Sequence, residues 1–330
     1  MLIQLHDGAP ASDVRKALQG LGLWTRELTR GDGRIGAFEV KPGSAPVSLE
    51  AIRAVPGVCD VHSPTSGHPH VDAAQGASVQ VGSVDLTGDA PVLIAGPCSI
   101  ESEEHIHSLA SHARRAGATI LRGGAFKPRT SPHAFSGHGA VALGWMREAA
   151  DSAGLAMVTE VLSETTVDLV AERADMLQIG ARNMQNFALL HAVGRTGLPV
   201  LLKRSRSASI EEWLLAGEHL LHAGATSVVF CERGIRGFDP STRNLLDMGA
   251  IAILRHELGQ PVIADPSHAT GRRDLIKPLA NAAIAAGAHG VMVEFSEDAS
   301  TAPSDGPQAI APDQLHALGA HRGLIEEPRP

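Results

Sequence analysis

The 330-residue sequence predicts an α/β protein in which a (β/α)8 barrel follows a small α+β domain of ferredoxin-like type. Two observations predict the barrel: short apolar runs recur eight times after residue 90, and segments of helical character separate them. Such a regular alternation is the order expected of parallel strands joined by helices. A third observation, a different order of elements before residue 70, predicts the separate first domain.

Residues 1–70 are expected to form the ferredoxin-like domain, which is a candidate regulatory unit. We expect strands over residues 1–5, 34–40 and 59–63, and helices over 11–22 and 48–58. Residues 71–88 are rich in small, polar and turn-forming side chains and are expected to be a linker. The catalytic barrel domain is then expected over residues 89–330.

The eight apolar runs define the strands expected in the barrel. They cover residues 91–95, 118–122, 155–160, 175–180, 199–203, 227–232, 261–265 and 289–294. The clearest helical segments between them cover residues 102–117, 164–174, 209–224 and 273–287. An open doubly wound sheet is the competing interpretation, but it explains eight even repeats less well, and no GxGxxG turn follows any of these runs.

Composition narrows the class of protein. The net charge of −8 argues against nucleic acid as a partner, because binding phosphate chains requires a broad basic surface. No apolar run approaches the ~20 residues that cross a bilayer. Three scattered cysteines do not make a disulfide framework, and the first residues lack the features of a signal peptide. We therefore expect a cytoplasmic protein with no membrane partner.

Cations collect where the expected strands end. Catalytic groups of such barrels lie on the loops at the carboxyl ends of the strands. The cations at these positions are Arg122, Lys127, Arg129, Arg182, Lys203, Arg204 and Arg233. Surface charges have no reason to choose one face of a barrel, and guanidinium groups match phosphate and carboxylate oxygens. The pattern predicts a site for one or two small phosphorylated anions.

A second group of residues at the strand ends suits a metal ion. It consists of one thiol, one imidazole and two carboxylates: Cys98, His268, Glu294 and Asp305. The first, seventh and eighth strands become neighbours when the barrel closes, so these side chains come from adjacent loops. A mixed sulfur, nitrogen and oxygen set can hold a divalent transition metal such as Mn, Fe, Co or Zn.

Seven segments resemble the motifs of one enzyme family. They are GPCSIES, LRGGAFKPRTSP, QIGARNMQN, LLKR, CERGIR, DPSHATGRRDL and SDGPQ, in this order between residues 96 and 308. They resemble 3-deoxy-D-arabino-heptulosonate 7-phosphate (DAHP) synthases of the class I β-type, which often carry an N-terminal ferredoxin-like extension. The resemblance implies a transferase that condenses phosphoenolpyruvate with erythrose 4-phosphate, the first step of the shikimate pathway and of aromatic amino acid biosynthesis.

The resemblance also implies roles for single residues. Arg122, Lys127 and Lys203 would hold the carboxylate of phosphoenolpyruvate, and Arg182 and Arg233 its phosphate. Pro128, Arg129 and Thr130 would receive erythrose 4-phosphate. The metal would lie on Cys98, His268, Glu294 and Asp305. Glu160 is a candidate for positioning the attacking water, and Lys127 or His268 can move protons.

The chain departs from the family pattern at a few positions, and other functions stay open. The departures are His133, Ser205, Arg206 and Ser296. The nearest alternative is 3-deoxy-D-manno-octulosonate 8-phosphate synthase, whose loop after the second strand is KANRSS-like rather than KPRTSP. Another is a non-catalytic, effector-binding regulator on the same barrel. For an active enzyme, the resemblance implies a homo-oligomer, commonly a tetramer. Feedback control of such an enzyme by an aromatic effector at the N-terminal domain is a further alternative that stays open.

Overall fold

The computed structural model describes residues 1–31, 33–41, 43–62, 66–127, 136–298 and 308–320. Contacts divide the chain into two compact units, Met1–Gly67 and His68–Pro330. Within the described ranges, no helix is both long and apolar enough to span a membrane.

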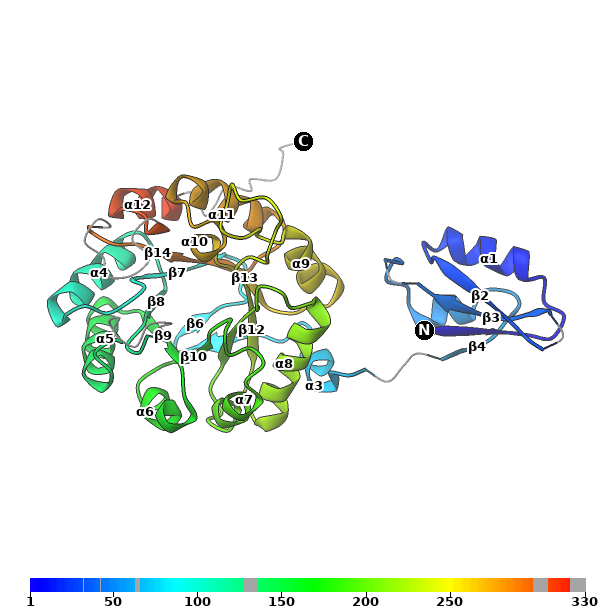
Figure 1. Cartoon of the computed structure of the whole chain (residues 1–330), viewed down its shortest axis with the longest axis horizontal. Helices are drawn as coiled ribbons and strands as arrows, with labels where there is room; N and C mark the ends of the chain where they lie inside the picture. Colours follow the sequence, from blue (N-terminus) through cyan, green and yellow to red (C-terminus); the bar gives the residue numbers. More distant parts are fainter. Residues whose placement is uncertain (32, 42, 63–65, 128–135, 299–307, 321–330) are drawn as a thin grey trace. The chain divides into compact units, whose positions relative to one another are not determined.

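The first unit is a four-stranded antiparallel sheet with two helices (Figure 1). Its elements are β1 (Leu2–Leu5), α1 (Ala11–Gly20), β2 (Thr25–Thr29), β3 (Ile35–Val40), α2 (Leu49–Arg53) and β4 (Val58–His62). In the strand order β2-β3-β1-β4, strand β3 lies between β1 and β2, the two strands that helix α1 connects in the sequence. Ile3, Leu18, Phe38 and Ile52 are fully buried between sheet and helices, which gives the unit a core of its own.

Strand β2 is absent from the elements expected from the sequence. Its residues, TRELT, are mostly polar, and their side chains are exposed or half-buried. The strand lies at the edge of the sheet, where only one side pairs with a neighbour. A strand in this position does not need the apolar alternation by which buried strands are found in a sequence.

The second unit is a closed barrel of eight parallel strands, as the sequence predicts. The strands are β7 (Val92–Gly96), β8 (Ile120–Gly123), β9 (Ala156–Val161), β10 (Met176–Ile179), β11 (Val200–Lys203), β12 (Val228–Glu232), β13 (Val262–Ala264) and β14 (Gly290–Glu294). The ends of each strand lie within two residues of those of a predicted apolar run, and β14 pairs with β7 to close the barrel. The runs are apolar throughout because parallel strands are covered on both faces.

Helices form a ring outside the strands (Figure 1). They are α4 (Glu103–Arg115), α5 (Ala140–Ala153), α6 (Val167–Ala171), α7 (Phe187–Gly194), α8 (Ile210–Ala223), α9 (Met248–Ala252), α11 (Ile276–Ala285) and α12 (Pro312–Ala320). The short helix α10 (Pro266–Thr270) instead lies in the segment that follows β13. Helix α8 begins with a capping box, in which Ser209 and Glu212 bond each other's backbone N–H groups. It ends at Gly224, whose φ of 117° is a conformation that favours glycine.

Residues 71–88 differ from the linker expected from the sequence. Helix α3 (Pro69–Ala73) packs on α8, and a hairpin of β5 (Gln80–Val81) and β6 (Val84–Asp85) follows it. Val79, Val81 and Leu86 are almost fully buried in one cluster with inward side chains of the barrel strands. The small, polar residues form the turns of this segment, while a few apolar side chains fix it to the amino-terminal end of the barrel.

Candidate active site

A cavity of about 410 Å3 lies at the carboxyl-terminal end of the strands, the mouth of the barrel. Its lining comes from the carboxyl ends of seven different strands, β7 to β13, and from the loops that follow them. The lining residues are Cys98, Arg122, Lys127, Glu160, Gln178, Gly180, Ala181, Arg182, Lys203, Ser205, Arg206, Arg233, Arg243 and His268. Seven of these side chains are cations and one is a carboxylate, so the cavity is suited to anions.

Five of the cations expected at this site line the cavity. They are Arg122, Lys127, Arg182, Lys203 and Arg233. Three further residues expected to bind substrate, Pro128, Arg129 and Thr130, lie outside the described residues. Arg182 is exposed, whereas Arg122, Lys203 and Arg233 are almost fully buried. Burying three cations beside one cavity is costly unless anions compensate them.

Arg122 is held by the protein and still has a free donor. Its guanidinium donates to the Pro97 carbonyl at 2.9 Å and to Glu294 Oε1 at 2.8 Å. Burial opposes the charge, but the carboxylate of Glu294 outweighs it and raises the pKa of Arg122. Among the described residues, no acceptor reaches the buried Arg122 Nε. An anion in the cavity would satisfy this donor, since buried N–H groups are rarely left unpaired.

Lys203 and His268 share one buried carboxylate, that of Asp265. Asp265 Oδ2 lies 2.7 Å from Lys203 Nζ and 2.7 Å from His268 Nδ1, and Oδ1 accepts from the His268 backbone N–H. Burial raises the pKa of Asp265, but the cationic partners overcome it and leave the pKa far below its usual range. Burial likewise lowers the pKa of His268, but Asp265 and Glu294 outweigh it and raise the pKa to about 10.

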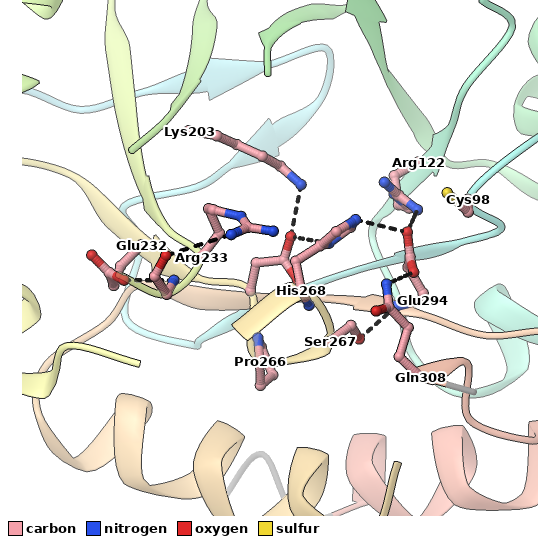
Figure 2. Close-up of polar contacts among 12 residues, drawn as sticks. Cys98, Arg122, Lys203, Glu232, Arg233, Pro266, Ser267, His268, Glu294 and Gln308 are labelled. Atoms are coloured by element: carbon pink, nitrogen blue, oxygen red, sulfur yellow. Dashed lines mark hydrogen bonds and ion pairs between the residues drawn. The ribbon is translucent and has the colours of Figure 1, made fainter. Parts of the chain in front are cut away.

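The candidate metal ligands meet at the side of the same cavity (Figure 2). Donor atoms of Cys98, His268 and Glu294 lie within 4.8 Å of one another, and His268 Nε2 is 3.1 Å from Glu294 Oε1. The fourth candidate, Asp305, lies outside the described residues. Because Asp265 occupies Nδ1 of His268, the Nε2 atom is directed to Glu294, as in the carboxylate-supported histidines of metal sites. One sulfur, one nitrogen and one oxygen donor fit a divalent transition metal.

Comparison with known proteins identifies the family of this chain. The model of the DAHP synthetase I family matches residues 71–323. The chain belongs to this family. The match covers the whole barrel and includes every residue of the cavity lining.

Relatives of the family show how far the likeness extends. The phospho-2-dehydro-3-deoxyheptonate aldolase of Thermotoga maritima is 40% identical over 317 residues, which are 94% of this chain and 93% of the relative. Its crystal structure superposes with a TM-score of 0.75, covering 98% of this chain and 96% of that one at 38% identity. The 2-dehydro-3-deoxyphosphooctonate aldolase of Bartonella henselae is 31% identical and covers 73% of this chain and 92% of the relative.

Glu160, the candidate for positioning the attacking water, also lies in the cavity wall. Its carboxylate lies over Gly180 of the GARN segment, where any side chain would overlap Oε1. The glycine therefore makes the space in which Glu160 can face the cavity.

Lys127, a candidate for moving protons, also lines the cavity. Its Nζ donates to the Cys98 carbonyl at 2.7 Å and lies 3.0 Å from Cys98 Sγ. The ammonium group therefore lies against the sulfur of a candidate metal ligand.

Three residues at or beside the cavity were not expected from the sequence, and one residue that was expected there lies elsewhere. Arg243, Gln178 and Asp265 were not expected at the site, although Asp265 opens the DPSHATGRRDL motif. Arg204 was expected among the cations of the mouth. The structure instead buries it, with bonds of 2.9 Å to both Glu232 and Asp247.

The buried ion pairs of Arg204 support the neighbouring cation. Glu232 also accepts from the backbone N–H of Gly234 at 2.7 Å, so both neighbours of Arg233 in the chain are fixed. Arg204 further lies over the ring of Trp213 at 5.6 Å. A cation at a strand end can therefore stabilise the fold rather than line the cavity. Its position in the sequence does not distinguish these two roles.

Proposed function

We propose that this chain condenses phosphoenolpyruvate with erythrose 4-phosphate to give DAHP and inorganic phosphate, as a transferase of the shikimate pathway. The observation that carries the proposal is a cavity with seven cations beside a Cys–His–Glu cluster, in a chain that belongs to the DAHP synthetase I family. Both substrates are small phosphorylated anions, and one carries an aldehyde that a metal ion can polarise.

The cations orient phosphoenolpyruvate. Arg122, Lys127 and Lys203 would hold its carboxylate, and Arg182 and Arg233 would hold its phosphate. With both ends clamped, the enol carbon can be directed at the aldehyde carbon of the sugar phosphate. Holding two reactants in one geometry removes much of the entropic barrier to their reaction. The second phosphate would be received by Pro128, Arg129 and Thr130.

Cys98, His268 and Glu294, with Asp305, would hold a divalent metal ion. When bound, such an ion supplies Lewis acidity to the aldehyde oxygen of the sugar phosphate. Asp265 holds His268 at Nδ1 and so keeps Nε2 for the ion. Mn, Fe, Co and Zn all suit this set of donors.

Water addition at C2 of the former enol completes the reaction, and phosphate leaves with cleavage of the C–O bond. Glu160 would orient this water, because among the described residues that line the cavity its side chain is the one carboxylate. Lys127 Nζ would move the proton. With Nδ1 on Asp265 and Nε2 kept for the ion, His268 would act as a ligand rather than as the second candidate for proton transfer. A Glu160→Gln enzyme should therefore lose turnover more than substrate affinity, and unchanged turnover would remove this role.

The closest competing function uses arabinose 5-phosphate in place of erythrose 4-phosphate. The test is phosphate release from phosphoenolpyruvate with each sugar phosphate in parallel, in the presence of Mn2+. We expect release with the four-carbon sugar alone. Release with the five-carbon sugar alone would favour the octulosonate synthase, and silence with both would favour a non-catalytic regulator.

The N-terminal unit is proposed to regulate the barrel of a homo-oligomer, with an aromatic amino acid as effector. Its separate hydrophobic core supports an independent function. If each aromatic amino acid leaves the activity of the full-length enzyme unchanged, this part of the proposal fails. Sedimentation of the purified chain as a monomer would exclude the oligomer.

A further inference from the structure

Gln308 lies between a candidate metal ligand and a cation of the cavity wall. Its side chain is buried, and Gln308 as a whole is only 2% exposed. The Nε2 group donates to Glu294 Oε2, as Figure 2 shows. The Oε1 atom accepts from Arg243 NH1 at 2.9 Å. Three side chains from three separate segments are thus joined by two hydrogen bonds.

Arg243 decides the direction in which the amide of Gln308 donates. A guanidinium group has donors only, so the atom of Gln308 that faces Arg243 must be the carbonyl oxygen. The NH2 group is then turned toward Glu294, whose ionised carboxylate has acceptors only. The opposite amide orientation would set donor against donor and acceptor against acceptor. A flipped amide would therefore lose both bonds at once.

The two oxygens of Glu294 have different partners. Oε1 lies 2.8 Å from Arg122 NH1 and 3.1 Å from His268 Nε2, on the side of the candidate metal cluster. Oε2 accepts from Gln308 on the other side. Glu294 is 1% exposed, so water does not replace a lost partner easily. Gln308 fixes the rotation of the carboxylate and thereby leaves Oε1 directed at His268.

We propose that Gln308 is a positioning residue for metal binding by Glu294, and that Arg243 acts on Glu294 through Gln308. The inference rests on the metal site of the proposed function. Partners that orient metal-ligating side chains from behind typically contribute roughly 10- to 100-fold in metal affinity. Arg243 has a second role, because it also lines the substrate cavity.

The first test is metal affinity without substrates. Chelator-stripped wild type and Gln308→Met, which keeps side-chain length without the amide, are titrated with Mn2+ by calorimetry. Co2+ is titrated in parallel, because its thiolate absorption band reports coordination by Cys98. We expect roughly 10- to 100-fold weaker binding of both ions by the variant, with the cobalt–thiolate band retained at saturation.

The second test separates the two roles of Arg243. Arg243→Met should weaken metal binding in the wild-type background and have no further effect in Gln308→Met, because its action passes through the amide. Arg243→Lys, which keeps one donor, should recover part of the affinity. Arg272→Met is the matched control: Arg272 is a nearby arginine paired with Asp274 rather than Gln308, and its loss should leave metal affinity unchanged.

The outcomes distinguish this inference from the proposed function. Unchanged metal affinity in Gln308→Met would overturn the positioning role. Equal losses from Arg243→Met in both backgrounds would overturn the relay through Gln308. If Gln308→Met does not fold, Arg243→Met alone decides, since an exposed side chain is replaced, and unchanged affinity would again overturn the relay. Wild type that binds no metal would end both, whereas intact metal binding without phosphate release would end only the proposed function.

Discussion

The two ends of the barrel are built from the same strands but differ in their side chains, which are apolar at one end and mostly charged at the other. At the amino-terminal end, the β5–β6 hairpin closes the interior with Val79, Val81 and Leu86. At the mouth, the interior opens into a cavity lined by seven cations. The closed end contributes apolar burial, and the mouth contributes charge that the protein only partly compensates. Stability and function are therefore concentrated at different ends of one structure.

A step of two residues connects the two ends. Side chains of a strand point inward at every second position. Ile120, Leu201 and Met292 lie in the apolar interior. Two residues further along the same strands come Arg122, Lys203 and Glu294, so the strand that fixes the core also aims the functional group.

The largest effect expected from this comparison is at Arg233. Burial, opposed by Asp265 but strengthened by the nearby Arg243, lowers its pKa, so its charge is unfavourable in the free protein. Within the described residues its guanidinium has one long hydrogen bond, 3.5 Å to the Gly234 carbonyl. Arg233→Met should raise the KM for phosphoenolpyruvate by about 100-fold, the value of two charged hydrogen bonds.

The same Arg233 variant should keep its melting temperature or gain a few degrees, because an uncompensated buried charge is removed. Steady-state kinetics and calorimetry measure the two quantities, with Arg272→Met as the control. An unchanged KM together with a lower melting temperature would show that Arg233 contributes to stability rather than to substrate binding, and would contradict the prediction.

The closed end should give the opposite result. Leu86 is fully buried under the barrel, so Leu86→Ala should reduce the free energy of unfolding by about 2–5 kcal/mol. Its KM for phosphoenolpyruvate, measured well below the melting temperature, should stay that of wild type. Denaturant titration and kinetics on one preparation test this, and a large change in KM with full stability would contradict it.

A buried histidine at the closed end should make stability depend on pH. Arg255 faces His289 Nε2 and can only donate, so this nitrogen must accept and the ring must be neutral. Burial, with the charge of Arg255, lowers the pKa of His289 to about 4. The unfolded chain, with a usual pKa near 6.5, then binds more protons as pH falls, and stability decreases.

Between pH 7 and pH 5 this difference amounts to about 2 kcal/mol. Denaturant titrations of wild type and His289→Gln at both pH values measure it, because the variant lacks the titrating group. The loss of stability on acidification should be smaller in His289→Gln. Equal losses in the two proteins would exclude His289 as the cause.

The smallest effect is expected at Arg206, one of the departures from the family pattern. Its side chain is exposed at the edge of the cavity, near enough to Arg233 to oppose its charge. Arg206→Ala should raise the KM for phosphoenolpyruvate only roughly two- to fivefold, as for other exposed charge pairs. The effect should disappear in high salt, because exposed charges are screened. An effect that persists in high salt would show that Arg206 is desolvated on binding.

The barrel strands and most residues of the mouth can be predicted from the sequence because buried apolar runs end in polar residues. Apolar runs such as 199–203 are buried on both faces, and the polar residue that ends this run, Lys203, is expected at the strand end. The same logic finds Cys98, His268 and Glu294 on neighbouring loops, and these side chains do converge.

What the sequence does not reveal depends on contacts between distant segments. Gln308 and Arg243 are 65 positions apart and meet only in the folded chain. Arg204 looks like its neighbour Lys203 until the buried carboxylates of Glu232 and Asp247 are placed beside it. Residues 71–88 read as a linker because only a few of their side chains, such as Val81, bind them to the barrel.

The most direct test of the account is a Mn2+ titration of chelator-stripped wild type and Cys98→Ala, following phosphate release from phosphoenolpyruvate and erythrose 4-phosphate. We predict that release by wild type starts from background and rises with one bound ion. Cys98→Ala should require at least about 100-fold more Mn2+, because a direct ligand is lost. Full release by stripped wild type without metal, or a wild-type titration curve for Cys98→Ala, would contradict the account.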